Sequence, residues 1–170
     1  MTVFNIYLLG YNMSQAIILL DIDDCILPSV STHVGIINDN ESIFLNNITR
    51  LKKICEKWDI KIGILSSWAT HLDIGVDGNV ICKSSNRSER EQWGWFYQDL
   101  KPFFHDYRIG LTKESYIKSY VQNPDWKKVI VLDDTDFSSC VNHNNGSYFI
   151  RGDGYIDNGM IGIIKKIMES

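Results

Sequence analysis

Hydrophobic residues along the chain gather in short runs that polar stretches separate. Four such runs occupy residues 16–20 (AIILL), 60–65 (IKIGIL), 129–132 (VIVL) and 147–150 (SYFI). Each run is too short for a typical helix, and Ile and Val are frequent among them, so we interpret all four as β-strands. Their apolar residues are mostly consecutive, which is typical of strands that are buried on both faces of a sheet.

Helical patterns lie between these runs. The first covers residues 41–57 and is preceded by Asn38 and Asn40, which are candidate N-caps. A second pattern begins at Thr112, and a third covers residues 159–168. The apolar face of the first helix consists of Phe44, Leu45, Ile48, Leu51, Ile54 and Cys55. Strands that alternate with helices predict βαβ crossovers, and hence an α/β fold with a mainly parallel sheet covered on both faces.

Candidate chemistry follows the predicted strands directly. The residues concerned are Asp21, Asp23 and Asp24 after the first strand, Ser66 after the second, and Asp133 and Asp134 after residues 129–132. The carboxyl ends of parallel strands meet at one edge of a sheet, where ligands of α/β proteins bind. Since neighbouring carboxylates repel one another, we expect a positive charge at this edge.

The segments ILLDIDD, IGILSS, GLTKES and VIVLDD follow one another in this order. In type and order they resemble the motifs of the haloacid dehalogenase (HAD) superfamily of phosphohydrolases, and the likeness spans residues 16 to about 150. It implies a three-layer α/β/α Rossmann-like core, with about five strands in the order 5-4-1-2-3 and a minimal cap. The third strand of that sheet is expected at residues 79–83 or at 106–110.

The resemblance also implies roles for individual residues. Asp21 would attack phosphorus and form an aspartyl-phosphate, and Asp23 would act as general acid and then as general base. Ser66 would bind a phosphoryl oxygen, with Ser67 as the alternative if the strand ends one residue later. Lys113 would neutralise the phosphate and the nucleophile.

Three other lysines compete for the last role. Lys127 and Lys128 precede a predicted strand and so lie at its amino end, away from the predicted site. Lys118 lies a turn or more along the helix that begins near Lys113. The order of the elements therefore favours Lys113.

The expected cofactor is Mg²⁺. The resemblance implies that Asp133 binds it together with Asp21 and the backbone carbonyl of Asp23, while Asp134 is a direct or water-mediated ligand. Oxygen donors of this kind are the ones that Mg²⁺ prefers, and substrate phosphate commonly completes its coordination. The sequence leaves open which of Asp133 and Asp134 binds the metal directly.

We therefore predict a Mg²⁺-dependent phosphomonoester hydrolase. The alternatives are a phosphotransferase and a non-catalytic phosphate- or partner-binding module of the same fold. The segment 68–110 bears on the substrate, because Lys83, Arg87 and Arg90 precede Trp93, Trp95 and Phe96 there. Cations beside exposed aromatic rings would bind a nucleotide or a nucleic-acid end. The other interpretation is that these rings form the buried face of a helix and that the charges are only solvated.

The bulk composition sets the remaining limits. With 170 residues, of which 44% are hydrophobic and 22% charged, the chain has the size and composition of one globular domain. Met13 offers an alternative start, which would make residues 1–12 an N-terminal extension and residues 13–170 the domain. The net charge of −4 argues against a protein that coats nucleic acid with its whole surface.

Cysteine spacing and hydropathy predict a cytoplasmic protein. The four cysteines are scattered without a CxxC pair, so neither a zinc site nor a disulfide framework is indicated. No apolar run approaches 18 residues, and we expect no membrane partner. The sequence does not determine the oligomeric state.

Overall fold

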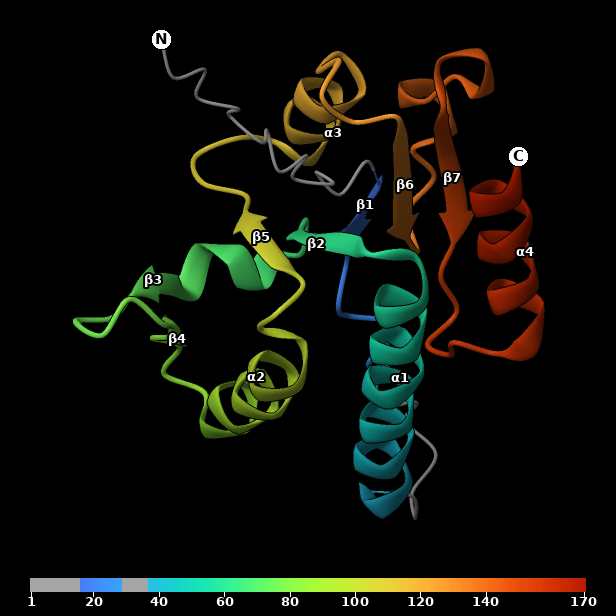
Figure 1. The fold of residues 1–170 in the computed structure, drawn as a ribbon. Coiled ribbons are helices and arrows are strands. Elements are labelled where there is room, and N and C mark those ends of the chain that lie inside the picture. The colour runs from blue at the N-terminus through green and yellow to red at the C-terminus, as the bar shows by residue number, and fades with distance from the viewer. Residues whose placement is uncertain (1–15, 29–36) are drawn as a thin grey trace, which may run out of the picture.

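The fold is built on one parallel sheet of five strands. It is seen in a computed structural model that describes residues 16–28 and 37–170 (Figure 1). The strands of this sheet are β1 (Ala16–Leu20), β2 (Ile60–Ile64), β5 (Phe104–Tyr107), β6 (Lys128–Asp133) and β7 (Ser147–Arg151). Every neighbouring pair is parallel, which confirms the predicted α/β class with a mainly parallel sheet.

The strand order is β5-β2-β1-β6-β7, which differs in its labels from the expected 5-4-1-2-3. The reason is a separate antiparallel hairpin of β3 (Leu72–Ile74) and β4 (Val80–Cys82), which precedes β5 in the chain. When the five strands of the large sheet are counted alone, they read 5-4-1-2-3 from β7 to β5. Of the two segments expected as third strand, residues 79–83 contain β4 of the hairpin and residues 106–110 overlap β5.

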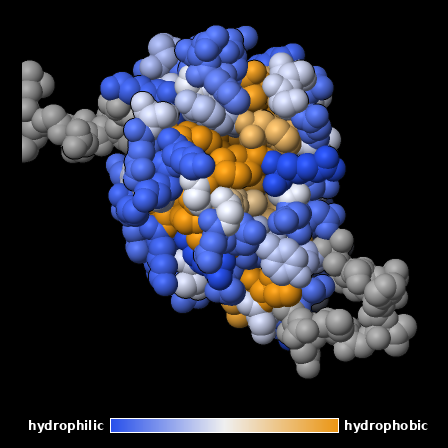
Figure 2. All heavy atoms as spheres, turned by 90° about the vertical axis from the view of Figure 1, so that its right-hand side faces the viewer, coloured by the Kyte–Doolittle hydropathy of each residue, from blue (hydrophilic) through white to orange (hydrophobic). Residues whose placement is uncertain are grey.

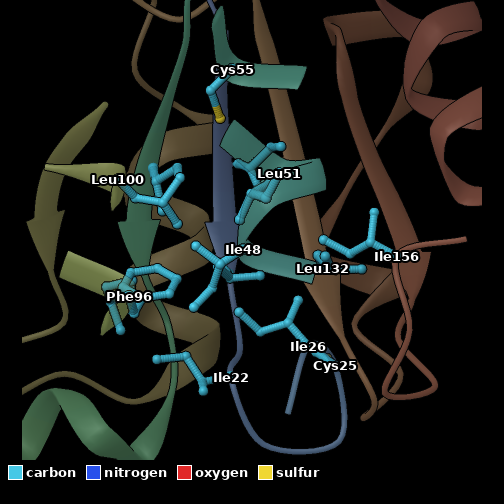
Figure 3. Packing of buried hydrophobic residues seen from close by; sticks show 14 of the residues in the cluster. Ile22, Cys25, Ile26, Ile48, Leu51, Cys55, Phe96, Leu100, Leu132 and Ile156 are labelled. Carbon is cyan, nitrogen blue, oxygen red and sulfur yellow. The ribbon is translucent and has the colours of Figure 1, made fainter. Parts of the chain in front are cut away.

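Helices cover both faces of the sheet. They are α1 (Ile37–Trp58), α2 (Arg87–Leu100), α3 (Lys113–Val121) and α4 (Asn158–Glu169). Residues of α1, α2 and α4 form one apolar cluster with Ile18 and Leu20, and Figure 3 shows part of it. Residues of α3 form a second cluster with Ile17 and Leu19. Because side chains of a strand alternate between its two faces, the molecule has three layers, with β1 in the middle.

The ends of the central strands are aligned. Leu20, the last residue of β1, pairs with Ile64 of β2 and with Leu132 of β6. Beyond these pairs the backbone N–H of Asp21 donates to the carbonyl of Leu132 at 2.8 Å. The residues that follow the three strands therefore reach the same edge of the sheet, as the sequence predicts.

Two helix starts test the predicted caps. α3 begins as expected, with Thr112 as its N-cap, since Oγ1 of Thr112 accepts from the backbone N–H of Ser115 at 3.1 Å. The prediction for α1 is wrong, because α1 begins at Ile37 and both Asn38 and Asn40 lie within it. The apolar pattern marks only the turns that pack against the sheet, and a polar first turn extends the helix beyond them.

Several predictions fall outside the described residues. These are the N-terminal extension at 1–12, the start at Met13, and most of the short cap that the resemblance implies after the first strand. Among the helices that the structure describes, none is long and apolar enough to cross a membrane. On the side of α4, polar residues cover most of the surface and leave an apolar patch among them (Figure 2).

Candidate active site

One lysine bridges two buried carboxylates at the carboxyl edge of the sheet. Nζ of Lys113 lies 2.7 Å from Oδ2 of Asp21 and 2.8 Å from Oδ2 of Asp133. Asp21 follows β1, Asp133 ends β6, and Lys113 is the first residue of α3. Only 4% of Asp21 and none of Asp133 is exposed to solvent. The structure thus places the expected positive charge between two of the predicted carboxylates.

The charges in this cluster do not cancel. Burial lowers the pKa of Lys113, but its hydrogen bonds and ion pairs with Asp133 and Asp21 outweigh burial and raise that pKa above the ordinary value. Lys113 is therefore protonated at neutral pH. Burial, followed by repulsion from Asp21, raises the pKa of Asp133, while Lys113 acts in the opposite direction. One ammonium group between two carboxylates leaves negative charge at the site, which favours a second cation.

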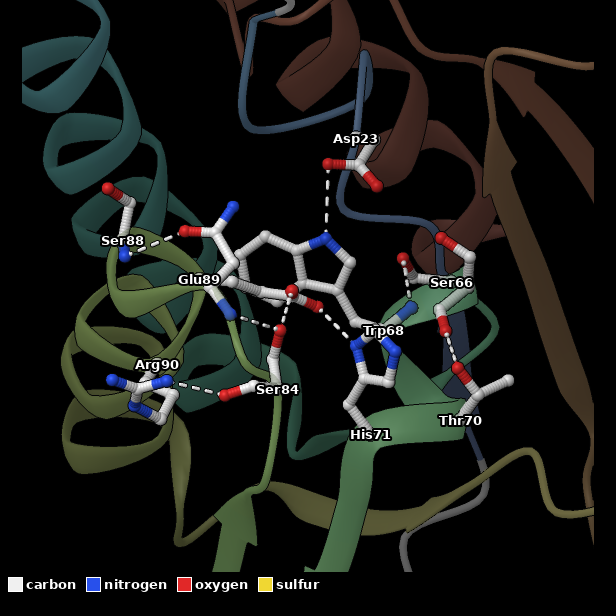
Figure 4. Close-up of polar contacts among 11 residues, drawn as sticks. Asp23, Ser66, Trp68, Thr70, His71, Ser84, Ser88, Glu89 and Arg90 are labelled. Carbon is white, nitrogen blue, oxygen red and sulfur yellow. Dashed lines mark hydrogen bonds and ion pairs between the residues drawn. The ribbon is translucent and has the colours of Figure 1, made fainter.

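Asp23 has a different environment from Asp21. Its Oδ1 accepts a hydrogen bond of 3.1 Å from Nε1 of Trp68, as Figure 4 shows. Burial and the neighbouring Asp21 raise the pKa of Asp23, whereas the hydrogen bond from Trp68 lowers it. Two carboxylates two residues apart, one paired with a lysine and one with a raised pKa, have the asymmetry that separates a nucleophile from a general acid.

Ser66 is the buried hydroxyl at the end of β2. No part of it is exposed, and its Oγ caps the short helix Ser67–His71 by accepting from the backbone N–H of Trp68 at 3.2 Å. A hydroxyl that accepts this bond can still donate to a ligand oxygen. The alternative, Ser67, is exposed and lies one residue further into the short helix. The structure thus places Ser66, not Ser67, in the buried position, two residues after the last residue of β2.

The competing lysines lie elsewhere. Lys128 donates to the backbone carbonyl of Ile167 in α4. Lys118 and Lys127 are both exposed. Of these four lysines, only Lys113 has a side chain that contacts the carboxylates.

A second group of side chains at this edge has metal-ligand spacing. Ligand atoms of Asp21, Cys25 and Asp134 all lie within 4.8 Å of one another. Burial and then the charge of Asp21 raise the pKa of Cys25 far above its usual value, so Cys25 is a neutral thiol in the metal-free protein. Its sulfur is also a softer donor than the oxygens that Mg²⁺ prefers. The remaining donors, the carboxylates of Asp21 and Asp134, are hard oxygens that suit Mg²⁺. Asp133 follows next: its Oδ2 accepts from Lys113 and its Oδ1 from the backbone N–H of Thr135, which leaves each oxygen a second lone pair for a cation.

A cavity of about 430 Å³ opens beside Asp23. It lies between the turn after β1, the short helix at Trp68 and the start of α2. Its lining residues are Asp23, Leu27, Pro28, Asn40, Trp68, Asn86, Ser88, Glu89 and Gln92. The sequence predictions did not include the residues of α2 in this group. A local signal was present, because Asn86 with Glu89 three residues later is an N-cap signature, and Asn86 caps α2 by accepting from the N–H of Ser88.

The aromatic residues of α2 form the buried face of the helix, which is the second of the two interpretations of this segment. Trp93 and Phe96 are buried in the apolar cluster, and Trp95 packs at its margin. The cations that precede them have partners: Lys83 pairs with Asp73, Arg87 with Glu91, and Arg90 donates to the backbone carbonyl of Ser84. These residues therefore form no exposed array of rings and cations for stacking bases.

Comparison of the chain with protein-family models, with curated proteins and with solved structures finds no match. The fold and the site therefore define the chain by class. It is an α/β protein whose mainly parallel sheet is compatible with a Rossmann-like fold, with carboxylates and one lysine gathered at the carboxyl edge of the central strands.

Proposed function

We propose that the protein is a Mg²⁺-dependent phosphomonoester hydrolase of the HAD type that acts through an aspartyl-phosphate on Asp21. The observation that carries the proposal is the position of Lys113, whose Nζ contacts Asp21 and Asp133 at 2.7 and 2.8 Å. A carboxylate cannot approach a phosphate dianion unless positive charge compensates the repulsion. Electrostatic compensation of this kind is the main source of catalysis in phosphoryl transfer.

Asp21 and Asp23 divide the reaction between them in this proposal. A carboxylate oxygen of Asp21 forms a bond to phosphorus while the bond from phosphorus to the leaving oxygen breaks, and Asp23 gives its proton to that oxygen. Asp23 then takes a proton from water, whose oxygen attacks phosphorus and releases Asp21 and inorganic phosphate. The raised pKa of Asp23 supports the acid role, because it keeps the proton available at higher pH. The Ser66 hydroxyl and Lys113 orient the phosphoryl oxygens.

Asp21 and Asp134 would hold the metal ion, with Asp133 and the backbone carbonyl of Asp23 as further oxygen donors. When bound, Mg²⁺ would neutralise negative charge on the phosphoryl group and on the nucleophile. This assignment rests on the hard donor atoms, on the close approach of Asp21 and Asp134, and on the negative charge that Lys113 leaves uncompensated. A reducing, cytoplasmic location remains a prediction.

The test is phosphate release with Mg²⁺ from p-nitrophenyl phosphate, mononucleotides and 3′- and 5′-phosphorylated oligonucleotides. We expect activity in the unmodified protein, loss of at least about a hundredfold in Asp21→Asn and Asp23→Asn, and loss after chelation of the metal. Asp24→Asn is the matched control, because Asp24 has φ 57° and no role in the proposed chemistry, and Asn tolerates this backbone conformation.

The same assay separates the alternatives. If no phosphate is released from any of these substrates, this result would contradict a hydrolase and favour a binding module. Transfer of phosphate to an added alcohol without matching release would instead identify a phosphotransferase. If a phosphorylated form of the protein can be trapped, and if it no longer forms in Asp21→Asn, this result would support Asp21 as the nucleophile.

A further inference from the structure

We infer that the cavity beside Asp23 binds the leaving alcohol of the substrate, and that this alcohol is an uncharged polar group of nucleoside or sugar size without a second phosphate. The inference rests on the proposed function and extends it from a reaction to a substrate class.

The position of the cavity follows from Asp23. Asp23 is the residue that the proposed catalytic set shares with the cavity lining. The leaving oxygen must lie within hydrogen-bond distance of the acid that protonates it, so the rest of the alcohol extends from Asp23 into adjacent space. The volume of about 430 Å³ is within the range of small-molecule sites, roughly 300–1,000 Å³.

The charge of the lining excludes a second phosphate. Its two ionisable side chains, Asp23 and Glu89, are both acidic, and no lysine or arginine belongs to the lining that the structure describes. Arg90 follows Glu89 in the sequence, but its guanidinium donates to the backbone carbonyl of Ser84. Lys113 pairs with Asp21 and Asp133. A second phosphate in the cavity would therefore face carboxylates without a lysine or arginine among the described lining residues, since Arg87, between Asn86 and Ser88, pairs with Glu91.

The polar groups of the cavity suit neutral hydrogen-bonding ligands. Side chains of Asn40, Asn86, Ser88 and Gln92 supply amides and a hydroxyl, while Leu27, Pro28 and Trp68 supply apolar surface. This mixture, a few polar groups on an apolar wall, matches the polar and apolar faces of a nucleoside or a sugar ring.

Glu89 is held in place for such contacts. Its Oε1 lies 2.9 Å from Nδ1 of His71, and its Oε2 accepts from the hydroxyl of Ser84 (Figure 4). The side chain is only 13% exposed. Partners on both oxygens fix the carboxylate at the start of α2, where it can accept from ligand hydroxyl groups without first losing side-chain freedom.

The first experiment compares pairs of substrates by kcat/KM: adenosine 5′-monophosphate with adenosine 3′,5′-bisphosphate, and glucose 6-phosphate with glucose 1,6-bisphosphate. We expect the monophosphate of at least one pair to be preferred about tenfold or more. Gln92→Lys, which adds a cation to the lining, should reduce that preference by about tenfold. The matched control is Gln98→Lys on the same helix, where the side chain is exposed and lies outside the lining, and it should leave the preference unchanged.

Failure of this inference is distinguishable from failure of the proposed function. Hydrolysis of p-nitrophenyl phosphate together with equal use of mono- and bisphosphates would overturn the inference and keep the hydrolase. Calorimetric titration with adenosine and with glucose gives a readout besides activity, so the cavity is tested even in an inactive protein. The inference would be supported if adenosine or glucose binds and Ser88→Lys weakens that binding. It would be overturned if neither compound binds. The compound that binds identifies the alcohol as nucleoside or sugar.

Discussion

The indole Nε1 of Trp68 donates a hydrogen bond of 3.1 Å to Oδ1 of Asp23. This bond joins the segment after β2 to the segment after β1. Trp68 is only 5% exposed, so packing around its ring fixes the donor and thereby the orientation of the carboxylate. One buried side chain thus serves both the apolar cluster and the candidate active site.

Trp68→Phe should impair the proposed reaction more than it impairs folding. Loss of the hydrogen bond frees the Asp23 carboxylate, and we expect kcat to fall about tenfold. The bond also lowers the pKa of Asp23, so its loss raises that pKa further. Because the acid must be protonated, the alkaline limb of the pH profile of kcat/KM should move to higher pH.

The control for this variant is Trp93→Phe. Trp93 is 2% exposed, and its Nε1 donates to the backbone carbonyl of Val80 at 3.0 Å, away from the carboxylates. Both variants lose the hydrogen bond of a buried indole ring, and both should lose about 1–2 kcal/mol in urea unfolding. An equal pH shift in the two variants, or no shift in Trp68→Phe, would contradict a positioning role for Trp68.

The residues at this edge of the sheet were predictable from the sequence, because a small number of physical rules is enough to place them there. Consecutive apolar residues identify β1 and β6, and parallel strands bring Asp21 and Asp133 to the same edge. Thr112 is a cap residue, and its position fixes Lys113 at the start of α3. These inferences need only local patterns and the order of the elements.

Other parts of the site depend on tertiary packing, which the pattern does not encode. Trp68 follows the second predicted strand closely, which places it near the edge of the sheet, and its ring is typical of a core residue, but nothing in its sequence context shows that its N–H meets Asp23. Glu89 lies in a charged stretch that is typical of a solvated helix, yet α2 places it against His71 and the cavity. The hairpin was not predicted either: residues 79–83, which contain β4, were expected as one of two candidates for a strand of the large sheet, and β3 is only three residues long.

Lys113→Met should abolish the proposed activity and destabilise the protein. Without the ammonium group, Asp21 and Asp133 repel each other in a buried site, and we expect a loss of about 3 kcal/mol or more in urea unfolding. Lys118→Met, an exposed position on the same helix, is the matched control and should stay within about 0.5 kcal/mol of the unmodified protein. Unchanged stability of Lys113→Met would show that the ion pairs contribute little.

The same ion pairs predict a pH dependence in the metal-free protein. The folded state raises the pKa of Lys113 above its ordinary value of 10.5, so folding favours the charged form. This contribution to stability is fully present below that value and is lost as the pH rises through the folded-state pKa. Urea unfolding with a chelator present, measured between neutral and strongly alkaline pH, should show the loss in the unmodified protein and not in Lys113→Met.

Asn47 ties two loops at the site to α1. Its amide group donates to the carbonyls of Ile26 and Gly154 at 2.8 and 2.9 Å, and its Oδ1 accepts from the N–H of Ile156 at 2.9 Å. The residue is only 3% exposed. Asn47→Ala leaves all three backbone groups without this partner, and we expect a loss of about 3 kcal/mol in urea unfolding.

The matched control is Asn46→Ala, which replaces the exposed neighbour on the same helix. It should change stability by less than about 0.5 kcal/mol. Since the loop at Ile26 follows Asp21 and Asp23, the Asn47 variant should also bind phosphate analogues such as vanadate more weakly. Equal stabilities of the two variants would contradict the assigned role of Asn47.

Gly152 lets the strand end of β7 approach the turn that carries Cys25. A Cβ atom at this position would lie 2.3 Å from Sγ and 2.8 Å from Cα of Cys25, so Gly152→Ala must displace that turn. We expect a destabilisation of about 1–3 kcal/mol in urea unfolding. Because the turn directly follows Asp21 and Asp23, any phosphatase activity should fall as well.

Gly94→Ala, the same type of substitution, should stabilise the protein instead. Gly94 lies within α2, and a Cβ atom there would meet nothing within 4 Å. Alanine is the better helix former, so this variant should gain up to about 1 kcal/mol of stability.

Adding Cys25→Ala to Gly152→Ala should restore only part of the stability that Gly152→Ala loses, because the contacts with the Cα and Cβ of residue 25 remain. Full restoration by Cys25→Ala would instead mean that the thiol alone causes the clash and that the backbone of the turn adjusts freely.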